Sequence, residues 1–295
     1  MNVKRRRFLE VGAGAIAGST ISTGLYAWRF EPRWLERVEH ELPIAGLPMR
    51  LHGARLVQLS DLHLGESVEE EYIRHVFRLV DAMRPDFVAI TGDWITWSGP
   101  RQLDMLRRVL VSLPRARLAI VGILGNHDWG PGWRQAGIAD AVADACSRAG
   151  VALLRNRALT LGDFTFAGTD DLWAGHCAPE QFVLRGALDG PSLVLCHNPD
   201  ALDGAGWGSY KGWTLSGHTH GGQVHAPFLP PFVLPVRNRR YTRGRIVLGD
   251  GRRVYISRGI GHTLRVRFLV RPEITVHTLR PSESVQLASV DSDGP

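Results

Sequence analysis

Five short clusters of potential metal ligands each follow an apolar run that has the length of a buried β-strand. In chain order they are Asp61-Leu62-His63, Gly92-Asp93, Gly125-Asn126-His127-Asp128, His197 and Ser216-Gly217-His218-Thr219-His220-Gly221-Gly222-Gln223. Side chains two residues apart on an extended segment point the same way, so Asp61 and His63 can face one ion. One such cluster arises readily by chance, but five in an ordered series hardly ever do. The series predicts a metal site assembled at the ends of several strands.

The chain from about residue 43 onward alternates short apolar runs, motif loops and amphipathic helices, which is typical of an α/β fold. The pattern predicts strands at 54–59, 87–91 and 118–124, with helices at about 68–83, 103–113 and 139–149. Alternation between 151 and 169 indicates hairpins, and further strands are expected at 192–196, 213–215, 223–225, 244–248, 253–257 and 274–279. The second half is therefore richer in strands, and two stacked sheets flanked by helices fit best.

Composition narrows the class of protein. A chain of 295 residues with 44% hydrophobic residues can bury a sizeable core. The net charge of +6 comes from arginine, since Lys4 and Lys211 are the only lysines, and this bias indicates base composition more than a nucleic-acid surface. Cys146, Cys177 and Cys196 lack any metal-binding spacing, so they argue against a disulfide framework or a zinc ribbon and are interpreted as small buried residues.

The first thirty residues differ from the rest of the chain. Lys4-Arg5-Arg6-Arg7-Phe8-Leu9-Glu10 precedes a Gly/Ala-rich apolar run over 11–28, and this resembles a twin-arginine export signal with Arg5-Arg6 as the pair. We expect the export machinery to recognise it and to place the protein in the periplasm or on the extracytoplasmic face of the cell membrane. An amphipathic start to the fold is disfavoured by four glycines, and both a cleaved and an anchored form stay open. Residues 282–295 are expected to be disordered.

The order DLH, GD, GNHD, H and GHTH resembles the calcineurin-like metallophosphoesterase superfamily. The longer forms SDLHLG, GNHDW and SGHTHGGQ are similar to its YkuE/YaeI-type branch, as are Ser257-Arg258-Gly259-Ile260-Gly261 and the later Arg267. The resemblance implies a four-layer α/β/β/α sandwich of two mixed β-sheets flanked by helices, the metallo-dependent phosphatase fold. It covers about residues 40–280, so we expect one catalytic domain over 40–281 after a leader over 1–30.

The resemblance also implies a ligand scheme. Its first metal is held by Asp61, His63, Asp93 and His220, and its second by the bridging Asp93 with Asn126, His197 and His218. His127 takes the place of the general acid or transition-state stabiliser, and Asp128 is expected to orient it. Imidazole, carboxylate and amide ligands without thiolate suit Mn²⁺, with Fe²⁺ or Zn²⁺ as alternatives. Two divalent ions against two carboxylates leave a charge of about +2, which favours an anionic substrate.

The expected reaction is hydrolysis of a phosphodiester or diphosphate bond by a metal-bridged hydroxide. Protein phosphatases of the superfamily carry GDxVDRG, whereas this chain has Gly92-Asp93-Trp94-Ile95-Thr96, so a phosphoprotein substrate is disfavoured. Some members of the branch hydrolyse UDP-2,3-diacylglucosamine, which makes a lipid-linked substrate a hypothesis. That particular compound is made on the cytoplasmic face, which conflicts with an exported domain.

Two segments after the histidine pair bear on partners. Residues 227–235 are apolar, rich in proline and followed by arginines, so they predict either a lip that contacts a membrane surface or a loop packed over the sheet edge. The arginines between Arg237 and Arg245 keep a nuclease as a distant alternative, and nucleic acid is not expected. A non-catalytic envelope scaffold that only binds metal is the other alternative. The remaining histidines are interpreted as structural or surface residues.

Overall fold

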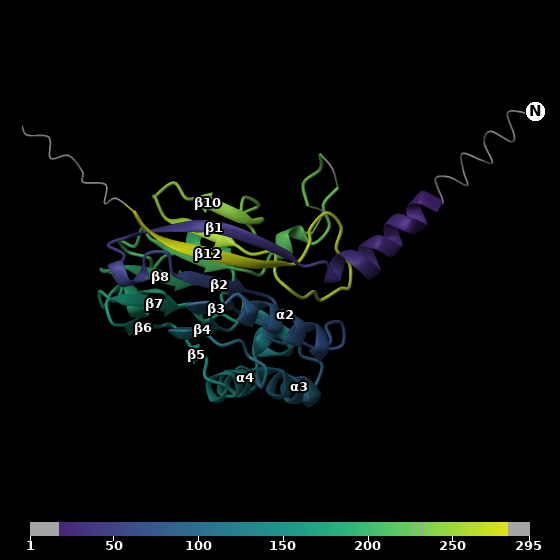
Figure 1. Cartoon of the computed structure of the whole chain (residues 1–295), viewed down its shortest axis with the longest axis horizontal. Coiled ribbons are helices and arrows are strands. Elements are labelled where there is room, and N and C mark those ends of the chain that lie inside the picture. Colours follow the sequence, from purple (N-terminus) through teal and green to yellow (C-terminus); the bar gives the residue numbers. More distant parts are fainter. Residues whose placement is uncertain (1–17, 227, 232, 283–295) are drawn as a thin grey trace, which may run out of the picture.

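A computed structural model describes residues 18–226, 228–231 and 233–282 of the chain. The arginine pair of the predicted leader and nearly all of the predicted disordered tail lie outside these residues. Two six-stranded sheets lie face to face, with strand orders β1-β12-β2-β3-β4-β5 and β10-β11-β9-β8-β7-β6 (Figure 1). Both sheets mix parallel and antiparallel pairs, so the fold class expected from the sequence is confirmed.

The first sheet is built from strand-helix units. Strands β2 (Arg55–Leu59), β3 (Phe87–Thr91), β4 (Ala119–Ile123) and β5 (Ala152–Leu153) are parallel. The helices α2 (Glu70–Ala82), α3 (Pro100–Leu110) and α4 (Ala136–Arg148) connect them. On the other side of β2, the antiparallel β12 (Glu273–Ser282) is followed by β1 (Glu36–Ala45) at the edge. The predicted strands and helices of this half are confirmed.

The second sheet begins with the predicted hairpin, β6 (Arg157–Leu161) and β7 (Phe164–Gly168). Strands β8 (Ser192–Leu195), β9 (Trp213–Ser216) and β11 (Arg253–Ile256) then run parallel to β7 and to one another. Strand β10 (Gly244–Val247) closes the edge in antiparallel pairing with β11. Parallel strands in both sheets therefore have carboxyl ends that can converge on one side of the sandwich.

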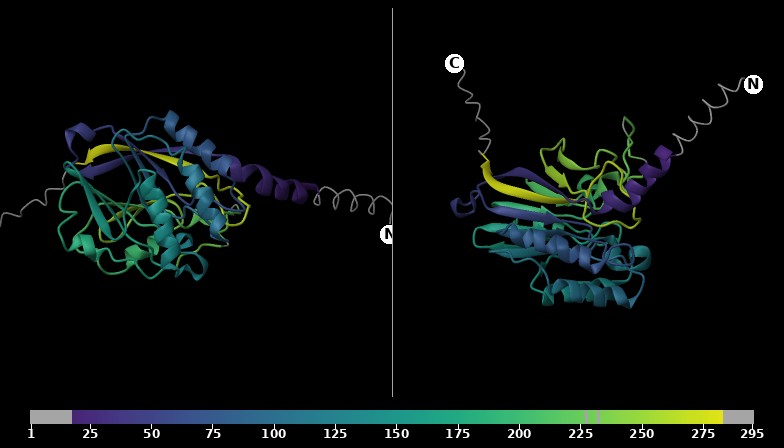
Figure 2. Two further views of the ribbon diagram at one scale, coloured as in Figure 1. Left: turned by 90° about the horizontal axis from the view of Figure 1, so that it is seen from below. Right: turned by 45° about the vertical axis from the view of Figure 1, so that its right-hand side comes forward.

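The core divides into three layers because side chains alternate along each strand. In β2, Leu56 packs between the two sheets while Val57 packs under the helices of the first sheet. The outer face of the second sheet is covered by shorter pieces, including the helix α5 (Glu180–Val183) and the 3₁₀ turn Pro199–Asp203 (Figure 2). The side chain of Trp207 packs in the same layer. All three cysteines are free, and Cys146 and Cys196 are buried as interpreted from the sequence, whereas Cys177 is only half-buried.

Two expectations differ from the structure. Residues 223–225 form no strand, because only an isolated bridge joins Val224 to Phe268. Strand β1 was not predicted from the sequence. Its first six residues alternate between half-buried and exposed, and they carry many charges, which is typical of an edge strand.

The described part of the N-terminal segment is helical over residues 18–25 and continues as a π-helix, Tyr26–Phe30, and a 3₁₀ turn, Glu31–Arg33. Within the described ranges, no helix has both the length and the apolar character needed to cross a membrane.

Candidate metal centre

The predicted ligands meet where strands of both sheets end. Asp61 follows β2, Asp93 follows β3 and Asn126 follows β4, while His197 and His218 follow β8 and β9 of the second sheet. Backbone hydrogen bonds hold these loops together, from Asp61 N to Gly92 O at 3.0 Å and from Gly217 N to His197 O at 3.1 Å. All seven predicted metal ligands are buried.

The backbone of the site is strained. A positive φ angle is uncommon outside glycine, yet five predicted ligands have one: Asp61 (53°), His63 (48°), Asp93 (54°), His218 (71°) and His220 (49°). Gly92 also has a φ of 94°, and a Cβ there would lie 2.8 Å from Nδ1 of His197. The sequence motifs therefore encode a backbone that turns sharply to aim its side chains inward.

One ligand group consists of Asp61, His63 and His220. The two imidazole Nε2 atoms lie 3.0 Å apart, and Nε2 of His220 lies 3.5 Å from Oδ1 of Asp61. Burial lowers the pKa of both His63 and His220 well below its usual range, so both rings are neutral. Two imidazole nitrogens and a carboxylate that converge in this way form a donor set that fits a divalent cation.

The second group consists of Asp93, His197 and His218, with Asn126 beside Asp93 in the same cavity. A single oxygen of Asp93, Oδ2, lies 3.4 Å from Nε2 of His63 and 3.2 Å from Nε2 of His197. This oxygen is therefore shared by the two groups. Both side-chain polar atoms of Asn126 are buried without a hydrogen-bond partner, which fits an amide oxygen reserved for an ion.

Neighbouring groups orient the imidazoles. Nδ1 of His197 lies 2.7 Å from the carbonyl of Thr91, and Nδ1 of His63 lies 2.8 Å from Oγ1 of Thr96. Nε2 of His218 lies 2.8 Å from the carbonyl of Pro235. An imidazole that donates its proton to a carbonyl or hydroxyl oxygen keeps the lone pair of its other nitrogen for a metal. The donor set and its supporting contacts thus fit divalent ions.

The charges of the second group are linked. Burial alone would raise the pKa of Asp93, but the nearby imidazoles of His197 and His127 outweigh it and hold this pKa well below its usual range. Burial alone would lower the pKa of His197, but the carboxylate of Asp93 outweighs it and raises this pKa to about 10. Without a metal, His197 therefore holds a proton where an ion would bind.

The two residues predicted to be catalytic lie in different surroundings. His127 lines the open cavity, with its ring centroid 4.8 Å from that of His63, and its backbone N–H donates to Asp93. Asp128 is fully buried and accepts hydrogen bonds from three backbone N–H groups, those of Trp94, Ile95 and Gly125. These contacts tie two motif loops together, and the predicted role of Asp128 in orienting His127 stays a prediction.

Other residues of the site carried no assigned role. The guanidinium of Arg267 is fully buried without a carboxylate partner, and it donates to the carbonyls of Arg258, Gly259, Gly261 and Val270. The segment it holds reaches the metal centre, because Gly261 N donates to Asp61 O at 2.7 Å. Trp173 packs edge-on against His218, with ring centroids 4.4 Å apart. Neither residue is a metal-ligand type: the family resemblance marked Arg267 without giving it a role, and no motif marked Trp173.

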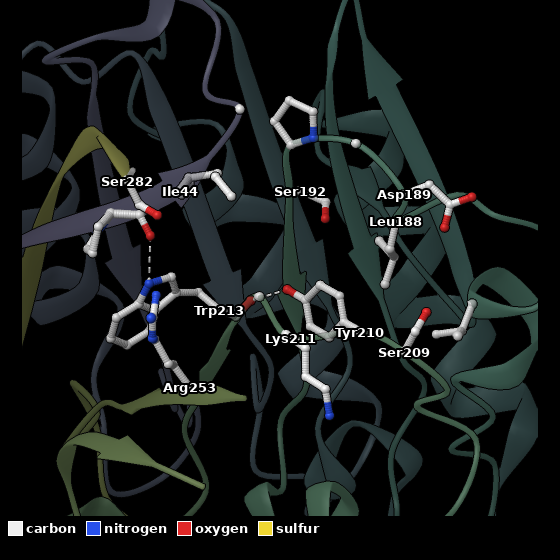
Figure 3. A pocket seen from close by; sticks show the side chains of 17 residues that line it. Ile44, Leu188, Asp189, Ser192, Ser209, Tyr210, Lys211, Trp213, Arg253 and Ser282 are labelled. Atoms are coloured by element: carbon white, nitrogen blue, oxygen red, sulfur yellow. Dashed lines mark hydrogen bonds between the residues drawn. The ribbon is translucent and has the colours of Figure 1, made fainter. Parts of the chain in front are cut away.

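The metal centre opens into a cavity of about 450 Å³. Asp93, Asn126, His127, His218 and His220 line its floor, and its walls are largely apolar, with Val224, Val233, Pro235, Leu264 and Val266. A second cavity of about 510 Å³ lies at the opposite end of the second sheet, where β8, β9 and β11 begin (Figure 3). Its lining includes Asp189, Lys211 and Arg253 but no histidine. Only the first cavity has a donor set for metal.

The arginines between 237 and 245 do not line one groove. Arg237 belongs to a cavity beside Trp173 and Asp203, whereas Arg245 packs over the ring of Trp213, 4.9 Å from its centroid. Arg239 donates to the carbonyl of Pro231. This scattered arrangement gives no support to a continuous nucleic-acid surface.

Fold and site together define a metal-dependent phosphoester hydrolase. Residues 54–229 match the family model of the calcineurin-like phosphoesterases, and the chain belongs to this family. It is 34% identical to the uncharacterized metallophosphoesterase YkuE of Bacillus subtilis, over 94% of this chain and 98% of that protein. It is 31% identical to the phosphodiesterase YaeI of Escherichia coli, over 93% and 98%. It is 26% identical to the UDP-2,3-diacylglucosamine pyrophosphatase LpxG of Chlamydia muridarum, over 90% and 95%.

Proposed function

We propose that this hydrolase holds two divalent ions and cleaves a phosphodiester or diphosphate bond in a small, lipid-linked molecule. The single observation that carries the proposal is Oδ2 of Asp93, which lies within 3.4 Å of an imidazole nitrogen from each ligand group. An oxygen so shared is suited to bridge two cations. With Asp93, one ion would be held by Asp61, His63 and His220. The other would be held by Asn126, His197 and His218, and Mn²⁺ is our first choice for both ions.

Two bound ions would supply an activated water and charge neutralisation for in-line displacement. The protein's own residues do the rest. Asp93 is kept anionic by its imidazole neighbours, and Thr91, Thr96 and Pro235 fix the ring orientations. His127 faces the cavity beside the ligands, where it can hold or donate a proton to the leaving oxygen. No nucleophilic side chain is needed.

The walls of the cavity support an amphiphilic substrate. A phosphoryl group at the metal centre would lie beside the apolar side chains of Val224, Val233 and Leu264. Such a lining suits an acyl chain better than a second charged group. The names of YaeI and LpxG, a phosphodiesterase and a lipid-diphosphate pyrophosphatase, are in line with this substrate class. We also propose export through the N-terminal arginine pair and action on the extracytoplasmic side.

The test uses the full chain reconstituted with Mn²⁺. Turnover is measured on a soluble artificial phosphodiester, a phosphomonoester and a lipid diphosphate, and bound metal is counted by elemental analysis. We expect two ions per chain and a preference for the diester and the lipid diphosphate. Asp93→Asn should abolish turnover without unfolding the chain, while the exposed Asp104→Asn serves as the matched control. Two bound ions without turnover of any compound would favour a metal-binding scaffold.

A further inference from the structure

Most of the large apolar side chains that are exposed in the described part of the chain belong to three segments. These are the N-terminal segment 18–34, the proline-rich loop in its described residues 228–231 and 233–235, and the loop 263–271. Their exposed members are Ile21, Leu25, Trp28, Phe30, Trp34, Phe228, Leu229, Val233, Leu264 and Leu269. Exposed apolar side chains scattered singly need no explanation, but a concentration of this kind indicates a contact surface.

The three segments lie together at one end of the molecule (Figures 1 and 2). The N-terminal segment is built into the fold there: Arg267 N donates to the carbonyl of Ala27 at 2.9 Å, and Val270 N donates to the buried carboxylate of Glu31 at 2.6 Å. The proline-rich loop follows directly, since His225 N donates to Phe268 O at 2.9 Å. The surface is therefore continuous across segments far apart in sequence.

This surface reaches the rim of the catalytic cavity. Val233 of the proline-rich loop and Leu264 of the loop 263–271 are exposed, and both also line the cavity above the metal centre. The amide of Gln223 donates to Leu264 O at 2.9 Å and so joins this rim to the histidine motif. A molecule resting on the surface would cover the opening to the metal centre.

The charges of the surface are almost all positive. Its three segments contain Arg29, Arg33, Arg265 and Arg271 besides the buried Arg267, and their one carboxylate, Glu31, is fully buried. Outside the segments, the carboxylate of Glu69 lies 2.7 Å from Arg33 and 4.0 Å from Arg265, so four arginines face one exposed acidic neighbour. Tyr26, Phe30 and Trp34 line a hollow of about 440 Å³ together with Arg29 and Arg33. Aromatic rings next to arginines are the side chains that proteins place at the headgroup level of a membrane.

The geometry points to this surface as a docking site for an anionic phospholipid bilayer, with the catalytic cavity opening into the headgroup layer. Apolar side chains enter the boundary between headgroups and acyl chains, and the arginines contact the lipid phosphates. Its consequence for catalysis, that an amphiphile passes from the bilayer to the metal centre, rests on the proposed function. The docking itself needs only the surface.

The test measures which face of the full chain enters a membrane. An environment-sensitive fluorophore is attached to Phe228→Cys or, as the control, to Leu184→Cys, which is also well exposed (80%, against 103% at Phe228) but lies outside the three segments. The unsubstituted chain, whose three cysteines are buried or half-buried, controls for stray labelling. On vesicles containing phosphatidylglycerol, the label at 228 should brighten about threefold and be quenched by brominated acyl chains. The label at 184 should do neither.

A second measurement addresses charge and apolar contact. Co-flotation should be at least about tenfold stronger with phosphatidylglycerol vesicles than with phosphatidylcholine alone. Leu25→Glu with Leu229→Glu should weaken it, whereas Val111→Glu with Leu184→Glu should not. If both double variants still float because residues 1–17 alone hold the chain on the vesicles, brightening and quenching of the label at 228 show whether the surface itself enters the bilayer.

The inference would be overturned if the chain floated with the vesicles while the label at 228 was not quenched by brominated acyl chains. It would also be overturned if the chain self-associated through this surface and did not float. Turnover of a soluble phosphodiester by the same preparations reports separately on the proposed function.

Discussion

The two ends of the sandwich carry cavities of similar size with very different chemistry. At the carboxyl ends of the strands, about 450 Å³ is floored by buried carboxylates, imidazoles and an amide. Where β8, β9 and β11 begin, about 510 Å³ is lined by Asp189, Tyr210, Lys211, Trp213 and Arg253 among small and aliphatic residues. Volume alone therefore does not identify a site.

The two cavities also differ in backbone strain and in buried polar atoms without hydrogen-bond partners. Five predicted metal ligands have a positive φ, whereas Tyr210, Lys211 and Trp213 have none. Both side-chain polar atoms of Asn126 lack a hydrogen-bond partner among the described residues, whereas in the opposite cavity the indole of Trp213 donates to Pro43 O and its carbonyl accepts from Tyr210. Strained, unsatisfied groups persist only where the rest of the structure holds them, and this is typical of functional sites.

The same substitution in each cavity gives the largest contrast. Asp61→Asn removes a ligand charge from the metal centre and should lower kcat/KM for a phosphodiester by on the order of 10³-fold. Asp189→Asn, in the opposite cavity, should leave it unchanged. Steady-state kinetics at saturating Mn²⁺ provides the comparison, with circular dichroism to confirm folding. Equal losses in both variants would mean that the opposite cavity takes part in catalysis.

A smaller effect is expected at His127. Its ring faces the cavity, and His127→Gln should lower kcat by about 10²-fold while the metal content stays unchanged, because a lost general acid typically has an effect of this size. The leaving group sharpens the test. A p-nitrophenolate leaving group needs no proton, so the loss should be much smaller with it than with an alkoxide. A loss that is independent of the leaving group would contradict the role of general acid.

Arg267 should matter for stability. Arg267→Met leaves several buried carbonyls without a donor, and we expect the free energy of unfolding to fall by about 3 kcal/mol. Arg265→Met, two residues away and partly exposed, should change it by less than about 0.5 kcal/mol. Urea denaturation of the metal-free chains measures both. Similar small changes would show that the loop does not depend on the buried guanidinium.

Much of the fold and of the candidate site could be predicted from the sequence, for a physical reason. The ligands stand within a few residues of apolar strands, so short-range spacing places Asp61, Asp93 and Asn126 at strand ends before any tertiary contact is known. Strand β1 could not be recognised in the sequence because an edge strand buries little surface and carries charges, so it lacks an apolar pattern. A strand was wrongly predicted at residues 223–225 because they alternate polar and apolar side chains, but in the structure only Val224 pairs with another segment, through one isolated bridge to Phe268.

Long-range contacts could not be predicted. Nothing near Arg267 in sequence announces that its side chain is buried, since its acceptors come from residues 258–261 and 270. The segment 18–34 has the composition of a leader, and only the tertiary structure places Ala27 and Glu31 against the loop 263–271. Interactions that join distant segments have no local signature.

The smallest expected signal is a proton count. In the metal-free chain the pKa of His197 is raised to about 10, so the ring is protonated at pH 8 and must lose that proton to bind an ion. Burial raises the pKa of Asp61 to about 6, so this carboxyl adds a second proton as pH falls below that value.

Metal binding should therefore release about one proton near pH 8, more toward pH 5.5 and progressively fewer as the pH rises through about 10. Apparent metal affinity should accordingly rise with pH across this range. Calorimetric titration with Mn²⁺ in buffers of different ionisation enthalpy counts the protons. Ion binding at pH 8 without proton release would mean that His197 is neutral before the metal arrives. In that case His197 and Asp93 would not form a charged pair in the metal-free chain, and the metal centre would lose the feature that most distinguishes it from the opposite cavity.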